Sequence, residues 1–368
     1  MINEQRLLNT FLDYVMTGSE TKNEKAMGEK LVRDLKALDL EVKTDKSGEA
    51  FGSNGFNICA YLPGSIPGDT TIMCAHMDTV APGKEIHPII DKGIIRTNGS
   101  TVLGGDDKSG IASIIEAVRV IREQNLPCRN TEIFFTIGEE GGMEGSKNRD
   151  MSMLRGKEAL VFDTSGEIGK ILLSEPGKVK ITATIVGKTA HAGLYPERGI
   201  SAIQVAAKAI AKMKLLRIDE ETTCNIGTLK AEYATNIVPE KIKLIAEARS
   251  RNLDKLNAQT AHIRKCLQDT CDEVGAKLEI QIDTEYESFH VKEDDPLVQR
   301  VIDSCNRLRY QAFTADGDGG SDANVMSLQG IKSLVLATGM TKVHTTEECL
   351  KVEDLNRCAK LALDLMTH

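Results

Sequence analysis

Hydrophobic residues follow two different periods along the first part of the chain. Apolar residues three and four positions apart predict amphipathic helices over 2–15 and 27–38. Four short runs predict strands, several of them apolar enough to be covered on both faces: 56–62, 70–75, 131–137 and 159–162. Helical spacing returns over 111–121. Strands that alternate with helices predict an α/β domain, with a mixed central sheet flanked by helices.

The pattern changes after Pro176-Gly177, where polar and apolar residues alternate over 178–186, as in a half-exposed strand. A helix, two strands, a helix and a strand are expected next, at 201–213, 222–229, 241–248, 254–274 and 277–284. This βαββαβ order is that of a ferredoxin-like α+β sandwich. The pattern of the first part of the chain then returns, and it predicts a helix, a strand and a helix at 296–309, 332–337 and 352–366. We therefore expect an inserted domain, 177–286, within a discontinuous domain formed by 1–176 and 287–368.

Composition narrows the class of protein. The chain has 368 residues, 46 Lys+Arg against 54 Asp+Glu and a net charge of −8, which argues against nucleic-acid binding. No apolar stretch approaches the length of about 18 residues that a membrane span needs, and the first residues lack the pattern of a secretion signal. Nine cysteines without CxxC spacing are typical of reduced thiols. We expect a cytoplasmic protein that binds neither nucleic acid nor membrane.

Residues with metal-binding or catalytic potential gather where predicted strands end, the edge at which open α/β sheets bind ligands. His76 and Asp78 follow one strand, Glu139-Glu140 follows another, and Asp163 ends a third. Two further motifs join this group, Asp106-Asp107 at a helix start and His344 after a late strand.

Each of these motifs alone is more often a turn or a helix cap, but together they favour a metal site. A two-metal hydrolytic centre needs imidazole and carboxylate ligands around cations about 3.5–4 Å apart, and an unligated base. Asp78 lies two residues after His76 on the same side of a strand, so it could orient that ring. The residues themselves do not separate Asp106 from Asp107 as the ligand.

In this set of motifs the chain resembles the dinuclear-zinc aminoacylase/carboxypeptidase (M20) superfamily of metallopeptidases. Within it, the chain is similar to peptidase T-like tripeptide aminopeptidases, over essentially its whole length. The resemblance implies His76 and Asp163 on one metal, Glu140 and His344 on the other, and Asp106 bridging both. It implies two divalent ions per subunit; zinc suits these ligands, and cobalt and manganese are compatible.

The resemblance also assigns roles beyond the metal ligands. Glu139 would be the catalytic base, and Asp78 the residue that orients His76. In the inserted domain, a lid, His191 would stabilise the oxyanion, reached by lid closure or across a homodimer interface. Contacts with a short peptide substrate are implied for four residues: Asn236, Arg249, Gly320 and Ser321.

Several functions stay open at this stage. Asp163 as the fifth ligand, rather than Glu, and the segment Gly138–Gly142 favour tripeptide cleavage. Carboxypeptidases and N-acyl-amino-acid amidohydrolases share the metal site, and the chain is shorter than a typical peptidase T. A catalytically inactive, metal-stabilised scaffold is the alternative outside enzymes. A serine hydrolase using Ser321 is disfavoured, because Ala323 stands where the GxSxG motif needs its last glycine.

Overall fold

The computed structural model describes all 368 residues, which divide into two compact units. The first unit contains Met1–Ser174, His290–Gly317 and Ser321–His368, and the second contains Glu175–Phe289 with Asp318–Gly320. The sequence placed 318–320 in the discontinuous domain. The structure groups them with the second unit, where Asp318 Oδ1 accepts a hydrogen bond from Arg251 Nη1 at 3.1 Å.

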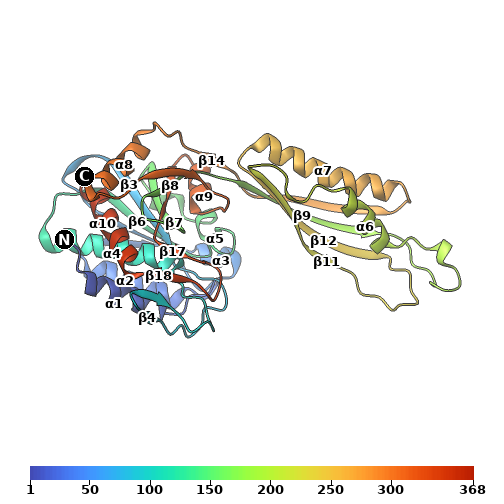
Figure 1. Ribbon diagram of the computed structural model, residues 1–368, viewed down its shortest axis with the longest axis horizontal. Coiled ribbons are helices and arrows are strands. Elements are labelled where there is room, and N and C mark those ends of the chain that lie inside the picture. Colours follow the sequence, from blue (N-terminus) through green and yellow to red (C-terminus); the bar gives the residue numbers. More distant parts are fainter. The chain divides into compact units, whose positions relative to one another are not determined.

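A nine-stranded mixed sheet forms the centre of the first unit (Figure 1). Its order is β1-β2-β6-β3-β7-β16-β8-β14, and β15 pairs with β8. Strands β6, β3, β7 and β16 run parallel, so their carboxyl ends meet at one edge. The bounds are β1 Glu41–Thr44, β2 Ile58–Leu62, β3 Ile66–His76, β6 Arg129–Thr136, β7 Glu158–Thr164, β8 Lys170–Glu175, β14 Phe289–His290, β15 Phe313–Asp316 and β16 Lys332–Ala337. This sheet and its flanking helices confirm the predicted fold class.

Helix α4 (Gly105–Gln124) is the central helix of this unit and contacts α1, α10, β3 and β7. Its residues are buried from Gly105 to Val118, because neighbours cover it on all sides. The other helices of the unit are α1 Glu4–Val15, α2 Lys25–Ala37, α3 Ser47–Phe51, α5 Glu144–Lys147, α8 Pro296–Leu308, α9 Asp322–Leu328 and α10 Val352–Thr367. No helix in the structure combines the length and apolarity that a bilayer crossing requires.

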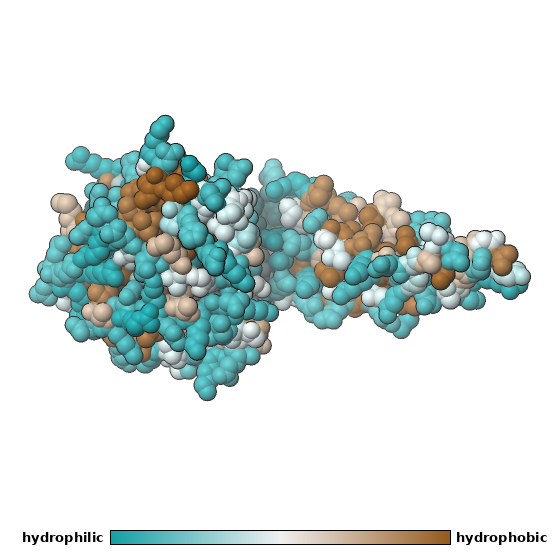
Figure 2. Space-filling model, turned by 90° about the horizontal axis from the view of Figure 1, so that it is seen from below, coloured by the Kyte–Doolittle hydropathy of each residue, from teal (hydrophilic) through white to brown (hydrophobic).

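A second, four-stranded antiparallel sheet lies in the same unit, in the order β17-β18-β5-β4. Its strands have two or three residues each, too few for the sequence pattern to reveal: β4 Ile89–Asp91, β5 Ile94–Arg96, β17 Met340–Thr341 and β18 Cys349–Lys351. The β4–β5 hairpin exposes Ile89, Ile90 and Ile94. The hairpin lies on the side of this unit that faces the viewer in Figure 2. The sheet joins the segment before Asp106 to the segment that carries His344.

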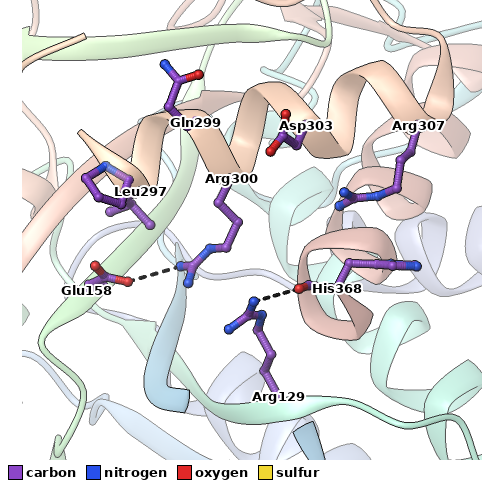
Figure 3. A pocket seen from close by; sticks show the side chains of 9 residues that line it. Arg129, Glu158, Leu297, Gln299, Arg300, Asp303, Arg307 and His368 are labelled. Carbon is purple, nitrogen blue, oxygen red and sulfur yellow. Dashed lines mark hydrogen bonds and ion pairs between the residues drawn. The ribbon is translucent and has the colours of Figure 1, made fainter. Parts of the chain in front are cut away.

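Arginines join the helices to the sheet at the edge where β6 and β7 begin (Figure 3). Arg129, the first residue of β6, donates from Nη2 to the backbone oxygen of His368 at 2.6 Å. Arg300 of α8 pairs with Glu158 Oε2 at 3.3 Å, and Arg307 of the same helix pairs with Asp364 at 2.6 Å. Through these contacts, the three arginines that line a cavity of about 460 Å³ each have a partner.

The second unit is one five-stranded antiparallel sheet, in the order β10-β11-β12-β9-β13, with helices α6 and α7 packed on it. Alternate residues of β9, among them Ile181 and Ile185, point into a core shared with both helices. The βαββαβ order is present, with the two-residue β10 added. The bounds are β9 Gly177–Val186, α6 Ala202–Lys212, β10 Leu216–Arg217, β11 Thr222–Lys230, β12 Lys241–Ser250, α7 Leu253–Asp272 and β13 Lys277–Tyr286.

The second unit has a core of its own. We therefore expect that shortening one buried side chain there destabilises this unit and leaves the first unit unchanged. Ile181 is fully buried, and Ile181→Ala should lower the free energy of unfolding of this unit by about 2–5 kcal/mol. Hydrogen exchange of the full chain should show faster exchange in 177–286 and unchanged exchange in α4. Thr182→Ala, on the opposite face of β9, is the matched control. Equal loss of protection in both units would show that their cores are not independent.

Candidate metal centre

The candidate metal centre lies where the parallel strands of the first unit end. His76 is the last residue of β3, Asp163 is the residue before the last of β7, and Glu139-Glu140 follows β6 after a short turn. Because β3 pairs in parallel with both β6 and β7, these side chains meet at one edge of the sheet. Asp106 reaches the same place from the start of α4, and His344 from the segment between β17 and β18.

Asp106 lies between the two histidines. Its Oδ1 is 3.1 Å from His76 Nε2, and its Oδ2 is 3.2 Å from His344 Nε2. His76 Nε2 is also 3.6 Å from Asp163 Oδ1, and His344 Nε2 is 3.1 Å from Glu140 Oε1. Each imidazole therefore shares Asp106 and has one carboxylate of its own, the arrangement expected of two cation sites with one bridging ligand.

The structure separates Asp106 from Asp107, which the sequence left equivalent. Gly104 adopts φ +70°, and Asp106 has an extended backbone, with ψ 105°, although it stands at the start of α4. Asp107 turns away, and its Oδ1 accepts a hydrogen bond from the backbone N–H of Gly110 at 3.2 Å, as a helix cap does. Asp106 is thus the residue that faces the histidines.

Asp78 organises two ligand segments at once. Its carboxylate accepts hydrogen bonds from the backbone N–H groups of Glu139 at 3.0 Å and Glu140 at 3.3 Å, and from the Thr21 hydroxyl at 2.8 Å. His76 Nδ1 lies 3.0 Å from the backbone oxygen of Asp78 and 3.4 Å from its carboxylate. A proton on Nδ1 leaves Nε2 as the metal-facing nitrogen. Asp78 thus fixes the Glu139-Glu140 turn as well as the imidazole.

The turn before Glu139 depends on glycine. Gly138 has φ +62°, and a Cβ there would lie 2.8 Å from the Phe51 ring, so a larger residue would meet both backbone strain and a clash. The backbone oxygen of Glu139 then accepts from the N–H groups of Gly142 and Met143, at 2.8 and 2.7 Å. The Glu139 side chain is left buried at 8% exposure, beside the metal-ligand cluster.

The acidic residues of the centre strongly perturb one another. Burial, followed by the charge of Asp163, raises the pKa of Glu139 well above its ordinary value. Burial also raises the pKa of Asp163, to about 7, despite the opposing effect of His76. Hydrogen bonds to Asp106 and Glu140 raise the pKa of His344 to about 10. So many carboxylates at one buried place call for positive charge to balance them.

The chemistry of the donors fits divalent cations. Ligand atoms of His76, Asp106 and Glu140 lie within 4.8 Å of one another, and so do those of His76, Glu139 and Asp163. Imidazole nitrogens and carboxylate oxygens are ligands of zinc and of related divalent metals. The five side chains that the sequence predicts as ligands are brought together.

Two residues around the centre were missed by the sequence analysis. Glu348 is 1% exposed, and its carboxylate accepts three backbone N–H groups in the Asp106 segment. Lys108 is fully buried in α4; burial lowers its pKa to about 8, although Glu348 and Asp78 act in the opposite direction. Nothing in the sequence distinguishes the buried Glu348 from the adjacent, exposed Glu347. A lysine directly after two aspartates likewise suggests an exposed ion pair.

In the second unit, His191 and Asn236 lie on neighbouring loops. The backbone N–H of Ala192 donates to the backbone oxygen of Asn236 at 2.9 Å, and His191 forms a bridge with Ile237. Nδ1 of His191 accepts from the N–H groups of Gly193 and Leu194, at 3.2 and 3.1 Å. This leaves the ring proton on Nε2, so that nitrogen is a hydrogen-bond donor.

Arg249 lies on the face of the second unit's sheet that the helices do not cover, and it already has a carboxylate partner. Its Nε and Nη2 donate to the two oxygens of Glu247, at 2.9 and 3.3 Å. The two residues are two positions apart on β12, so their side chains share one face. A substrate carboxylate at Arg249 would have to share the guanidinium with Glu247.

In the glycine-rich segment before α9, close packing explains Gly320 and helix capping explains Ser321. A Cβ at Gly320 would lie 2.5 Å from the Tyr286 ring. Ser321 is 1% exposed and caps α9, accepting from Ala323 N at 3.2 Å while Asn324 completes a capping box. Substrate contacts by these two residues stay a prediction.

Comparison with known proteins identifies the family of the chain. Residues 72–368 match peptidase family M20/M25/M40. The chain belongs to this family. The crystal structure of aminopeptidase PepT from Bacillus cereus is 39% identical with a TM-score of 0.93, over 100% of this chain and 98% of that one. A tripeptidase from Staphylococcus aureus is 37% identical with a TM-score of 0.96, over the same shares.

A more distant M20 protein shares the fold. The Bacillus subtilis protein YXEP, described as a dinuclear metal-binding peptidase, is 17% identical with a TM-score of 0.74, over 98% of this chain and 97% of that one. The expected family is confirmed, and this M20 protein is a peptidase.

The Thr21 hydroxyl is one of three donors to the buried Asp78 carboxylate, so its loss should destabilise the M20 peptidase measurably. Thr21→Val keeps the shape of the side chain, and we expect it to lower the free energy of unfolding by about 1.5–3 kcal/mol in urea. Thr17→Val removes an exposed hydroxyl bond to Asp13 and should change it by about 0.5 kcal/mol or less. Equal effects of the two variants would count against the organising role of Asp78.

Proposed function

We propose that this M20 peptidase removes the N-terminal residue from short peptides, tripeptides above all, using two divalent metal ions. The observation that carries the proposal is Asp106 between His76 and His344, with Glu139 beside them. The aminopeptidase and tripeptidase named among the similar structures support the choice of substrate, at 39% and 37% identity over the whole chain.

Five side chains would hold the metals. His76 and Asp163 would bind one cation, His344 and Glu140 the other, and Asp106 would bind both, as the pairs of short distances suggest. Bound divalent cations supply a Lewis acid for the scissile carbonyl and lower the pKa of water. Zinc suits the nitrogen and oxygen donors, and cobalt and manganese are compatible.

Glu139 is the proposed general base. It is buried beside the ligands, and Asp78 holds its backbone through one hydrogen bond at 3.0 Å. Its carboxylate takes a proton from the attacking water and then passes it to the leaving amine, so the side chain ends each turnover unchanged. Burial and the charge of Asp163 raise the pKa of Glu139, which makes its carboxylate a stronger proton acceptor.

Residues of the second unit are the proposed partners of the substrate. His191 presents Nε2–H, the donor that an oxyanion needs, because Nδ1 is already occupied by two backbone N–H groups. Arg249 and Asn236 are the proposed contacts of the substrate. We further propose a homodimer through this unit, and action in the cytoplasm, which suits nine free cysteines, eight of them buried.

Replacing the base should separate metal binding from turnover. Glu139→Gln keeps the size of the side chain but cannot take a proton, so we expect both metal ions to remain and kcat to fall at least about a hundredfold. Metal analysis by mass spectrometry and a tripeptide assay measure the two effects. Glu347→Gln, an exposed change at side-chain exposure 70%, is the control. Near-normal turnover in Glu139→Gln would remove Glu139 from this role.

A substrate panel tests the proposed specificity. We expect tripeptides with a free amino terminus to exceed dipeptides, tetrapeptides and N-acyl amino acids by at least about tenfold in kcat/KM. Preference for N-acyl substrates, or release of the C-terminal residue, would replace the aminopeptidase assignment by one of the related activities. Stoichiometric metal without turnover of any amide would instead support a metal-stabilised scaffold.

A further inference from the structure

Glu348 is a buried carboxylate whose oxygens are used by the backbone of a distant segment. Oε2 accepts from the N–H groups of Leu103 at 2.8 Å and Gly104 at 2.9 Å, and Oε1 accepts from the N–H of Asp106 at 3.0 Å. The partners are 242 to 245 residues apart in the sequence. Three charge-assisted bonds to one short segment fix its conformation more firmly than ordinary packing does.

The segment that receives Glu348 is shaped for this contact. Gly104 adopts φ +70°, and a Cβ at Gly105 would lie only 3.1 Å from Glu348 Oε1. Side chains at these positions would therefore strain the backbone or crowd the carboxylate. The bonded N–H of Asp106 belongs to the residue whose own carboxylate lies between His76 and His344.

Glu348 also belongs to the segment that carries His344, four positions earlier. β17 and β18 close this segment, and β18 pairs with β5, just before the segment of Asp106. The backbone N–H of Glu348 donates to the oxygen of Thr345 at 3.1 Å, so a tight turn links it to the histidine. The segment between β17 and β18 thus carries the His344 imidazole. Through Glu348, the same segment also holds the backbone of Asp106, whose carboxylate lies beside that imidazole.

From this geometry we propose that Glu348 is a positioning residue that sets Asp106 against His344 and thereby determines the affinity of one of the two cation sites, the one between Glu140 and His344. The proposal rests on the metal binding proposed above. Glu348 itself faces backbone N–H groups and is no metal ligand. The site formed by His76 and Asp163 does not contain His344, and Asp78 orients its imidazole, so this site should depend less on Glu348.

Stepwise zinc binding tests the proposal. Wild-type full-length protein, stripped with a chelator and titrated with Zn²⁺ against a chromophoric chelator, should bind two equivalents. Glu348→Gln keeps the shape but directs an amide N–H₂ toward backbone donors, so we expect one equivalent to weaken about 10–100-fold. The other equivalent should change by less than about threefold. If Glu348→Gln does not fold, Glu348→Asp, which retracts the carboxylate by one methylene, carries the same expectation.

Two further variants test whether the effect is particular to Glu348 and to the cation site of His344. Glu347→Gln is the same change at the adjacent exposed position and should leave both equivalents as in the wild type. His344→Ala should abolish the equivalent that Glu348→Gln weakens, and the double variant should show no additional loss.

Wild-type affinity for both equivalents in a folded Glu348→Gln protein would overturn the proposal, as would equal weakening of both. A merely structural role would lower the urea midpoint of the stripped protein and leave both zinc affinities unchanged. Failure of the wild type to bind two equivalents would instead refute the metal proposal, so the two failures are distinguishable.

Discussion

The crowding of buried carboxylates at the ends of parallel strands is the constraint on which the first unit depends. In one region of the molecule, Asp78, Asp106, Glu139 and Glu348 are at most 8% exposed, and the side chain of Asp163 is 9% exposed. Negative charges at such a place persist only with donors and cations around them. Backbone N–H groups donate hydrogen bonds to Asp78 and Glu348, whereas imidazoles lie beside Asp106 and Asp163. The irregular segments around the centre follow from the need to aim these donors.

The carboxylates of Asp78 and Glu348 position backbone segments, whereas the proposed ligands would bind the metal ions. Asp78 holds the turn of Glu139-Glu140, and Glu348 holds the segment of Asp106. Lys108, buried in α4, lies in the field of both. The proposed ligands are therefore supported by a second set of charges. Such outer contacts matter for metal sites because they fix the direction of each ligand.

The sequence predicted the fold class and most long elements, since their periodicity reflects burial directly. It could not predict β17 or β18, because strands of two or three residues leave no period to read. It grouped the candidate ligands by the ends of strands, yet left Asp106 and Asp107 equivalent. Only the backbone, extended at Asp106 and capping at Asp107, distinguishes them. Glu348 was beyond prediction because its partners are amide groups from a remote segment, which no side-chain pattern records.

The distance along the chain between Leu103 and Glu348 has a consequence for biosynthesis. During synthesis from the N-terminus, His76, Asp106, Glu140 and Asp163 leave the ribosome long before His344 and Glu348 do. Until residue 348 has been made, the N–H groups of Leu103, Gly104 and Asp106 lack their carboxylate acceptor. A product truncated before this segment therefore lacks both the His344 imidazole and the acceptor that holds the backbone of Asp106.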